Sequence, residues 1–339
     1  MNRPEIRHEP LVYEYRGDIL DNVHMGCLAL VDEAGKVVFS VGDPRSVVYM
    51  RSSAKPIQAL PVIQRRLDEA YGLTPEESTI FAASHSGQPH LIAALESIFA
   101  KTGFSESDLI MKPTVPADPD AAFAQRSAGD PPRKFNHNCA GKHAGILLLQ
   151  RALGGAIADY WKPEAAAQRE ILRAVSIVSE TDPERIGIGV DGCGVPVFGI
   201  PVASFATAFR NLAAPDRIRS GSLAEAASRF VPRMHQYPYM ISGYGRFCTL
   251  LNGDPNLVAK GGAAGVYGLG LKRQRMGLAF KMTSGSAKVW GHVIRQVLTD
   301  LDAADEATIR GLEALDPIEL RNDNDRVVGE FRTAFKISA

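Results

Sequence analysis

The sequence has no excess of either charge and no long apolar run. Lys and Arg number 38, and Asp and Glu also number 38, so the formal net charge is zero. Without a basic excess, the chain lacks the electrostatic attraction on which nucleic-acid binding depends. No window of about 18 apolar residues is present, which argues against a membrane span. The longest mostly apolar stretch, residues 195–209, is interrupted by two prolines and by two hydroxyl side chains.

The sequence also shows no export signal and contains few cysteines. Residues 1–8 contain no apolar segment of the kind that a secretory signal requires, so we expect a cytoplasmic protein. The four cysteines are too few for a disulfide scaffold and are expected to be reduced thiols: Cys27, Cys139, Cys193 and Cys248. The question is then whether any of them binds a metal or takes part in chemistry. The remaining composition, 45% hydrophobic and 22% charged, is typical of a globular protein.

Strand-like runs occur near both ends of the sequence, and helical spacing dominates the region between them. The expected strands are 11–15, 25–31, 37–41, 47–50, 79–84, 186–190, 257–260, 266–271, 277–283 and 327–335. The expected helices are 52–66, 90–101, 139–153, 164–179, 205–212, 223–234 and 288–301. Residues 113–138, rich in Pro, Asp and Ala, are expected to form a long loop. This order predicts an α/β (α+β) fold in which one sheet is assembled from both termini around an inserted helical region.

A possible nucleophile and base stand where an expected strand gives way to a helix, in Arg-Ser-Ser-Ala-Lys-Pro (residues 51–56). Ser52 and Lys55 are three residues apart, which places them on one side of a helix. A serine hydroxyl becomes a nucleophile when a neighbouring base takes its proton, and a lysine can be that base if burial lowers its pKa. The helix N-terminus also offers N–H groups to a developing oxyanion. The alternative is that Ser52 or Ser53 caps the helix and Lys55 is solvated.

Ser84-His85-Ser86-Gly87 lies at the end of another expected strand. Ser84 and Ser86 would share one face of that strand, with His85 on the other. A strand end is where small polar groups can face a cleft. The alternative is a turn whose hydroxyls cap the following helix.

Two of the cysteines have polar neighbours that suggest a site. Cys139, Lys142 and His143 stand at helical spacing i, i+3 and i+4, on one helix face. In Asp-Gly-Cys-Gly-Val-Pro, Asp191 and Cys193 lie two residues apart at a glycine-rich exit from a strand. Two cysteines on separate elements suit a metal site, although buried cysteines often act only as small apolar fillers. A lysine could join such a site as a ligand only after losing its proton.

Further basic residues occur in the C-terminal part. Lys260 and Lys281 fall inside expected strands, where a buried lysine must be paired or have a shifted pKa, unless it lies on a solvated face. Arg246, in a glycine-rich turn, could hold a substrate carboxylate or be an ordinary surface arginine.

Taken together, five motifs resemble those of the asparaginase II family of rhizobial type, also called class 3 L-asparaginases. They are Arg-Ser-Ser-Ala-Lys-Pro, Ser-His-Ser-Gly, Asn-Cys-Ala-Gly-Lys-His, Asp-Gly-Cys-Gly-Val-Pro and Gly-Arg-Phe-Cys, in that order, and the matches span residues 51–262. The resemblance implies a serine β-lactamase-like fold, a single domain over residues 1–339 and a homodimer. It also implies hydrolysis of L-asparagine to L-aspartate and ammonia.

The resemblance assigns two serine–lysine pairs to catalysis. Ser52 is implied to be the nucleophile with Lys55 as its base, and Ser84 and Lys260 to form a second pair at the same site. One segment departs from the family pattern, because Lys281 is followed by Thr-Ser-Gly-Ser, which is closer to the Lys-Thr-Gly of β-lactamases. This departure leaves Lys281 as an alternative to Lys260.

A zinc ion is the implied cofactor, held by Cys139, Lys142 and Cys193 with water completing the shell. In the family, zinc aids substrate binding and does not generate the nucleophile. Three further residues are implied to orient the substrate or the ligands: Arg51, His143 and Asp191.

Three rival functions stay open at this point. A serine hydrolase of the same fold could act on β-lactams or esters, although that chemistry has no use for the cysteine motifs. A non-catalytic, metal-stabilised protein could bind amino acids, but a pure binder has little need for buried lysines. A thiol nucleophile at Cys139 or Cys193 is the third option.

Overall fold

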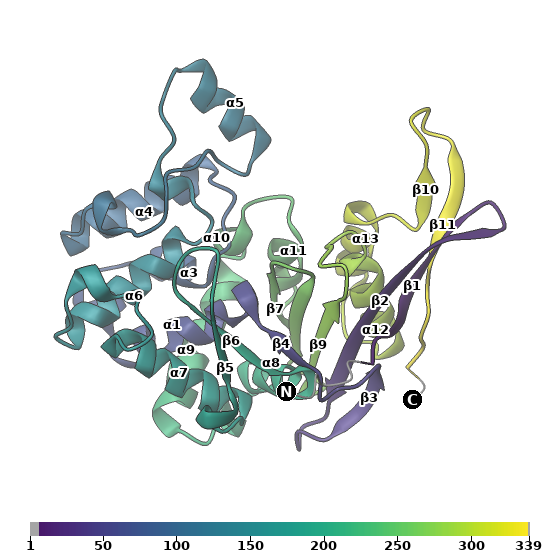
Figure 1. Ribbon diagram of the computed structural model, residues 1–339, viewed down its shortest axis with the longest axis horizontal. Coiled ribbons are helices and arrows are strands. Elements are labelled where there is room, and N and C mark those ends of the chain that lie inside the picture. Colours follow the sequence, from purple (N-terminus) through teal and green to yellow (C-terminus); the bar gives the residue numbers. More distant parts are fainter. Residues whose placement is uncertain (1–6, 338–339) are drawn as a thin grey trace. The chain divides into compact units, whose positions relative to one another are not determined.

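A computed structural model describes residues 7–337, and their contacts divide the chain into two compact units (Figure 1). Within the described residues, the sheet unit consists of residues 7–53, 199–214 and 250–337. The helical unit consists of residues 54–198 and 215–249, and it is inserted in the sequence between the strands of the two ends. The predicted inserted helical region is therefore confirmed, whereas the single domain over residues 1–339 stays a prediction.

An antiparallel sheet forms the centre of the sheet unit. Its order is β10-β11-β1-β2-β9-β8-β7, with β3 pairing with β2. Strand β1 pairs with β2 on one side and with β11 on the other, which joins the two ends of the chain in one sheet as predicted. The strands are β1 (Glu9–Arg16), β2 (Ile19–Val31), β3 (Val37–Val41), β7 (Leu257–Gly262), β8 (Val266–Leu271), β9 (Met276–Met282), β10 (Glu319–Arg321) and β11 (Val327–Thr333).

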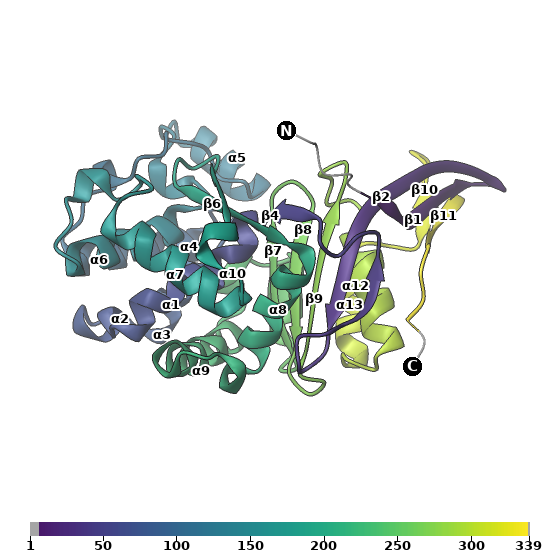
Figure 2. The ribbon, with the colours of Figure 1, turned by 60° about the horizontal axis from the view of Figure 1, so that its bottom comes forward.

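Helices cover both faces of this sheet. On β8, a Cβ at Gly268 would lie 2.1 Å from the ring of Phe209, so the absent side chain lets α8 (Val202–Ala213) pack closely. The neighbouring Tyr267 instead meets Trp290 of α12 (Trp290–Asp300), with ring centroids 5.1 Å apart. Because successive side chains of a strand point to opposite faces, α8 and α12 lie on opposite sides of the sheet (Figure 2). Helix α13 (Glu306–Leu315) packs against α12.

The helical unit is organised around α1 (Lys55–Gln64), whose residues 55–63 are all buried. Helix α1 packs against α6 (Ala140–Ala152), α7 (Ala166–Ser179) and α9 (Gly221–Gln236). The other helices of this unit are α2 (Leu67–Ala70), α3 (Pro75–Thr79), α4 (Pro89–Thr102), α5 (Pro119–Ser127) and α10 (Tyr239–Ser242). The chain passes from this unit to the sheet unit within α11 (Phe247–Gly253). Strand β4 (Val47–Tyr49) pairs with residues 199–201 of β6 (Pro196–Pro201), and β5 (Gly187–Val190) precedes β6.

Two local predictions were wrong. Residues 79–84 are not a strand, because α3 begins with a capping box between Thr74 and Glu77 and continues into a 3-10 turn, η2 (Ile80–Ala82). Residues 113–138 are not one loop, since they contain α5. The carboxylate of Asp118 caps α5 by accepting a hydrogen bond from the Ala121 N–H at 3.0 Å. A short apolar run does not distinguish strand from helix, whereas these caps do.

Glu77 is the titratable group for which we expect a measurable effect on stability. Burial alone would raise its pKa, but hydrogen bonds from Lys101, Ser97 and the Thr74 N–H hold the pKa below its usual value of 4.5. Both carboxylate oxygens lie 2.8 Å from the Lys101 amine. Glu77→Gln should therefore lower the free energy of unfolding at pH 7 by about 1–2 kcal/mol.

The pH dependence of this loss has a defined sign. A carboxyl group with a lowered pKa stabilises the fold above its unfolded pKa and stops doing so as pH falls through the folded pKa. The difference between wild type and Glu77→Gln, measured by urea unfolding, should therefore shrink below about pH 4.5. As a control, Glu225→Gln removes an exposed ion pair to Arg66 and should cost under about 1 kcal/mol. An equal loss in the two variants, or one that does not change with pH, would contradict this expectation.

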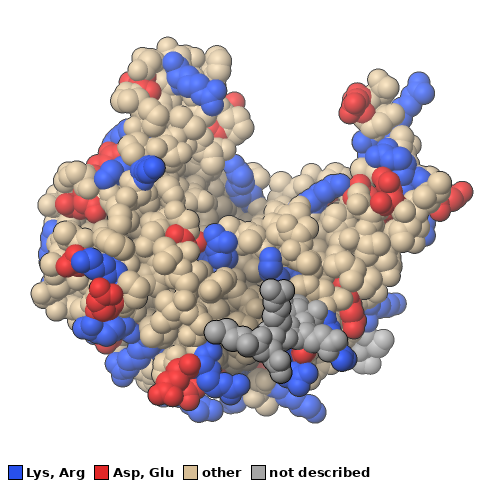
Figure 3. Space-filling model, in the orientation of Figure 1, with Lys and Arg blue, Asp and Glu red and all other residues tan. Residues whose placement is uncertain are grey.

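Basic and acidic side chains are mixed on the surface, as expected from their equal numbers in the sequence. On the face in Figure 3, blue and red side chains are interspersed and do not form a broad patch of one sign. Among residues 7–337, no helix combines the length and the apolarity needed to cross a bilayer.

Candidate active site

Lys55, the first residue of α1, is the centre of a buried polar cluster in the helical unit. Its side chain is fully buried, and its Nζ lies 2.7 Å from the Ala83 carbonyl, 3.0 Å from Ser84 Oγ and 3.3 Å from the Asn138 carbonyl. The half-buried Ser84 follows η2, and Asn138 precedes α6. Two other segments of the chain therefore converge on this one amine.

Burial shifts the Lys55 amine toward its neutral form. Burial, the largest influence, lowers the pKa of Lys55, and nearby Lys142 lowers it further, although the two cysteines oppose this. The two carbonyls can only accept hydrogen bonds, whereas the Ser84 hydroxyl can also donate one. Once the amine loses a proton, its lone pair can therefore accept a proton from a serine, which makes Lys55 a potential base.

Cys139 and Cys193 lie together beside Lys55. Both are free and almost fully buried, and their side chains are close enough to hydrogen-bond. The hydrogen bond from Cys193, together with Lys55 and Lys142, holds the pKa of Cys139 well below its usual value, against the opposing effect of burial. The same pairing raises the pKa of Cys193. Of the two thiols, Cys139 is therefore the more acidic.

Lys142 and Asp191 complete this cluster. Lys142 Nζ lies 2.9 Å from Cys193 Sγ and 3.9 Å from a carboxylate oxygen of Asp191. Burial would lower the pKa of Lys142, but Cys139 and Cys193 together raise it. The two sulfurs thus favour the ammonium form of Lys142.

The local backbone explains why these residues meet. A Cβ at Gly141 would lie 2.2 Å from the Ile80 carbonyl oxygen, so only glycine lets the start of α6 approach η2 this closely. That approach places Cys139 and Lys142 near Ser84. On the other segment, the Gly194 N–H donates to the Asp191 carbonyl at 2.9 Å, and Gly194 has φ 92°, a conformation that favours glycine. This turn directs Cys193 toward α6.

Three further side chains near this cluster, His85, His137 and Tyr160, were not predicted to take part in the site. His85 is buried, and burial followed by the charge of Lys55 lowers its pKa to about 3. His137 Nδ1 accepts the Cys139 N–H at 3.1 Å. The hydroxyl of Tyr160 lies 2.7 Å from Nδ1 of His143. His85 stands inside a motif that the sequence already singled out and His137 directly precedes another, whereas Tyr160 carries no sequence signal.

The remaining residues considered for catalysis or substrate binding, apart from Arg246, belong to the sheet unit. Arg51 and Ser52 lie in the 3-10 turn η1 (Arg51–Ala54), and Arg51 has φ 51°, a strained conformation for a non-glycine residue that is often found at functional sites. Lys260 on β7 is 1% exposed, with its Nζ 2.7 Å from the Gly261 carbonyl. Lys281 on β9 is half-buried and donates to the Met282 carbonyl at 2.9 Å. Lys260 is thus the more buried of the two lysines.

The helical unit offers a donor set that fits a thiophilic metal. Two sulfurs and one amine converge, and soft sulfur donors favour zinc. No group of three or more His, Cys, Asp or Glu side chains in the described part of the chain is arranged to hold a metal. The set is therefore complete only if the lysine serves as the third ligand, which requires Lys142 to lose its proton.

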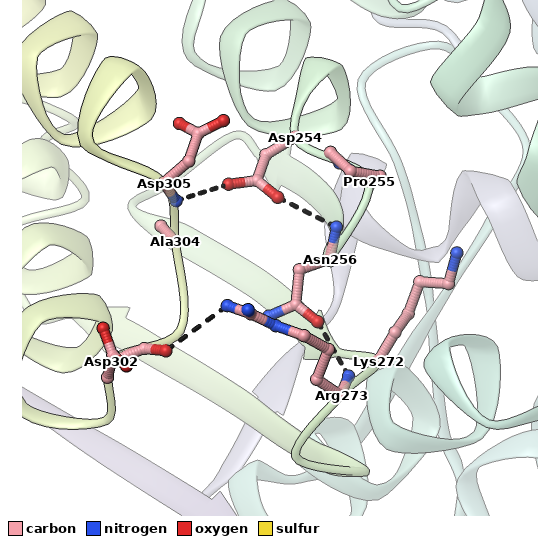
Figure 4. A pocket seen from close by; sticks show the side chains of 8 residues that line it. All are labelled: Asp254, Pro255, Asn256, Lys272, Arg273, Asp302, Ala304 and Asp305. Atoms are coloured by element: carbon pink, nitrogen blue, oxygen red, sulfur yellow. Dashed lines mark hydrogen bonds between the residues drawn. The ribbon is translucent and has the colours of Figure 1, made fainter.

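A separate pocket of about 550 Å³ lies in the sheet unit (Figure 4). Its polar groups largely bind one another. The Asp254 carboxylate accepts the N–H groups of Asn256 at 2.9 Å and of Asp305 at 3.1 Å, and Asn256 Oδ1 accepts the Arg273 N–H at 2.7 Å. These bonds tie β7, the β8–β9 turn and the start of α13 together. The eight residues that line the pocket include none of the predicted site residues.

Comparison with solved structures finds only distant similarity. Structures of Mglu, including its glutamate form, are 14–15% identical, with a TM-score of 0.44, and the match covers 82% of this chain. The chain spans only 61% of the length of those proteins. A β-lactamase from Mycobacterium bovis is 13% identical, with a TM-score of 0.41 and with 81% of this chain and 94% of that chain covered. No curated protein matches the sequence.

Comparison with family models is decisive. The model described as L-asparaginase II matches residues 12–333, nearly the whole chain and both units. This match includes every residue for which the motifs implied a role. The chain therefore belongs to the L-asparaginase II family.

Proposed function

We propose that this protein hydrolyses L-asparagine to L-aspartate and ammonia. Family membership supports an amide hydrolase of this type. The observation that carries the mechanism is the fully buried Lys55 amine, which has a lowered pKa and lies 3.0 Å from the hydroxyl of Ser84. Such an amine can take a proton from a serine at neutral pH, as a solvated lysine cannot.

In the proposed reaction, Ser52 attacks the side-chain amide carbon of asparagine while Lys55 takes the hydroxyl proton. The resulting tetrahedral intermediate expels ammonia, which receives the proton held by Lys55, and leaves an aspartyl ester on Ser52. Water, deprotonated by Lys55, then attacks the ester, and its proton returns to the serine oxygen as aspartate leaves. Ser84, in contact with Lys55, passes protons between the amine and the substrate, and Lys260 is its proposed second partner.

Zinc is the proposed cofactor, and Cys139, Lys142 and Cys193 would hold it. When bound, it supplies a positive charge that aids binding of the substrate's polar groups. Arg51, His143 and Asp191 are proposed to orient the substrate or these ligands. A homodimer, which derives from the family resemblance, stays a proposal, and so does a cytoplasmic location.

Removing one sulfur tests the metal proposal directly. Cys193→Ser should reduce bound zinc from about one ion per chain to near zero, because two weak ligands and one strong one do not retain the ion through desalting. Elemental analysis of the desalted protein measures this. Cys27→Ser, which changes a buried cysteine on β2 outside all five motifs, is the matched control and should retain zinc. Equal zinc in both variants would contradict the proposed ligand set.

A panel of substrates tests the reaction class. Purified protein should release ammonia from L-asparagine at least about tenfold faster, in kcat/KM, than from L-glutamine, because one extra methylene displaces the amide from the nucleophile. Nitrocefin hydrolysis without ammonia release would instead assign a β-lactamase-type hydrolase. Tight asparagine binding without ammonia release would assign an amino-acid-binding protein.

A further inference from the structure

Tyr160 makes two hydrogen bonds in the interior of the helical unit. It follows the 3-10 turn η5 (Ile157–Asp159) and is 1% exposed. Its hydroxyl lies 2.7 Å from Nδ1 of His143 on α6 and 3.0 Å from the backbone nitrogen of Ile110. The rings of Tyr160 and His143 meet edge to face, with centroids 5.5 Å apart.

These two contacts determine where the imidazole proton lies. The Ile110 N–H can only donate, so it occupies a lone pair of the phenolic oxygen. The hydroxyl proton of Tyr160 is then left for Nδ1, which must accept it and therefore carries no proton of its own. The reverse arrangement would leave a buried phenol proton without an acceptor among residues 7–337, which is costly. The proton of His143 consequently lies on Nε2.

The Nε2–H of His143 has no partner within the described part of the chain, although the side chain is fully buried. Buried donors are almost always paired, so an unpaired one indicates a place for an acceptor that the protein does not supply. His143 directly follows Lys142 on α6, and its backbone N–H donates to the Cys139 carbonyl at 3.0 Å, so it stands within one helical turn of two of the proposed zinc ligands. The free donor therefore belongs to the proposed active site.

We propose that Tyr160 is a positioning residue that fixes His143 as an Nε2–H donor, and that this donor binds an oxygen acceptor of the amino-acid substrate. A carboxylate or amide carbonyl oxygen fits, because both only accept hydrogen bonds. This inference depends on the proposed function, since it assumes that the cluster binds an amino acid. A purely structural pair would stabilise the fold without affecting ligand affinity.

The tautomer is measurable without any ligand or turnover. Nitrogen-15 NMR of histidine-labelled full-length protein distinguishes a protonated from an unprotonated ring nitrogen, and the signals absent from a His143→Gln sample belong to His143. We expect a single form with Nδ1 unprotonated and Nε2 protonated. We expect Tyr160→Phe to mix the two tautomers or to broaden the signals. A wild-type ring protonated at Nδ1 would overturn the proposal, whether or not Tyr160→Phe folds.

Binding of the product L-aspartate, followed by calorimetry, tests the donor. Tyr160→Phe should weaken binding about five- to tenfold, which is the effect of one misplaced hydrogen bond. His143→Gln, whose amide N–H₂ reaches the Nε2 position, should stay within about threefold of wild type. His143→Asn, whose amide reaches only the Nδ1 position, should lose about tenfold. Equal affinity in all three variants and wild type would overturn the proposed donor.

Ammonia release from L-asparagine separates the two proposals. The expected tautomer and aspartate affinities without ammonia release would overturn the proposed reaction but support the positioning role of Tyr160. Ammonia release with unchanged aspartate affinity in Tyr160→Phe and His143→Asn would support the reaction and overturn the positioning role.

Discussion

Replacing Ser52 with alanine should reduce kcat/KM for L-asparagine by at least about a thousandfold, the scale seen when a catalytic serine is removed. The reason is chemical, because alanine has no oxygen with which to form the aspartyl ester. Ser52 lies in the turn η1, which leads directly into α1, and Lys55 begins α1 three residues later. The small side chain should leave the fold unchanged, as circular dichroism and thermal unfolding can verify.

The adjacent serine supplies the matched control. Ser53 is fully buried, and its hydroxyl has no hydrogen-bond partner among the residues described. Ser53→Ala should therefore retain activity within a few fold. Full activity in a folded Ser52→Ala protein would contradict the assignment of the nucleophile. If Ser84→Ala instead abolished activity, Ser84 would take that role.

Replacing Lys55 with methionine should lower kcat by about 10²–10⁴-fold, the range expected for loss of a general base. Methionine keeps a similar shape in the buried site but cannot accept a proton. It leaves the Ala83 and Asn138 carbonyls without the amine they now bind, so some loss of stability is also expected. Rates should be measured well below the melting temperature of the variant.

An exposed lysine controls for loss of charge alone. Lys112→Met removes the same charge from an exposed position and should leave kcat unchanged. If Lys55→Met kept its kcat within tenfold of wild type, Lys55 would not be the base. Lys260→Met and Lys281→Met, assayed beside it, would show which of these lysines supports Ser84.

Periodic and local features of the site could be predicted from the sequence. The spacing of Cys139, Lys142 and His143 places them on one face of a helix, and α6 carries them there. The apolar runs at both ends of the chain indicated the sheet that joins β1 to β11. These predictions depend on neighbours within one or two turns of a helix or along one strand, where geometry follows from spacing.

Contacts between distant segments could not be predicted in the same way. Lys55 meets Ser84, which is 29 residues away in the sequence, and this contact depends on η2, which the short apolar run suggested was a strand. Tyr160 reaches His143 from a 3-10 turn that has no periodic pattern, so nothing in the sequence marked it. In both cases tertiary packing decides the partner.

The central claim, that a lysine-activated serine hydrolyses L-asparagine, is tested most directly by ammonia release from L-asparagine. Wild type, Ser52→Ala and Lys55→Met should be assayed side by side, each shown to be folded and to contain zinc. We expect continuous release of ammonia with equimolar aspartate by wild type, and almost none by either variant. No release by the wild-type protein, or full release by either variant, would contradict the claim.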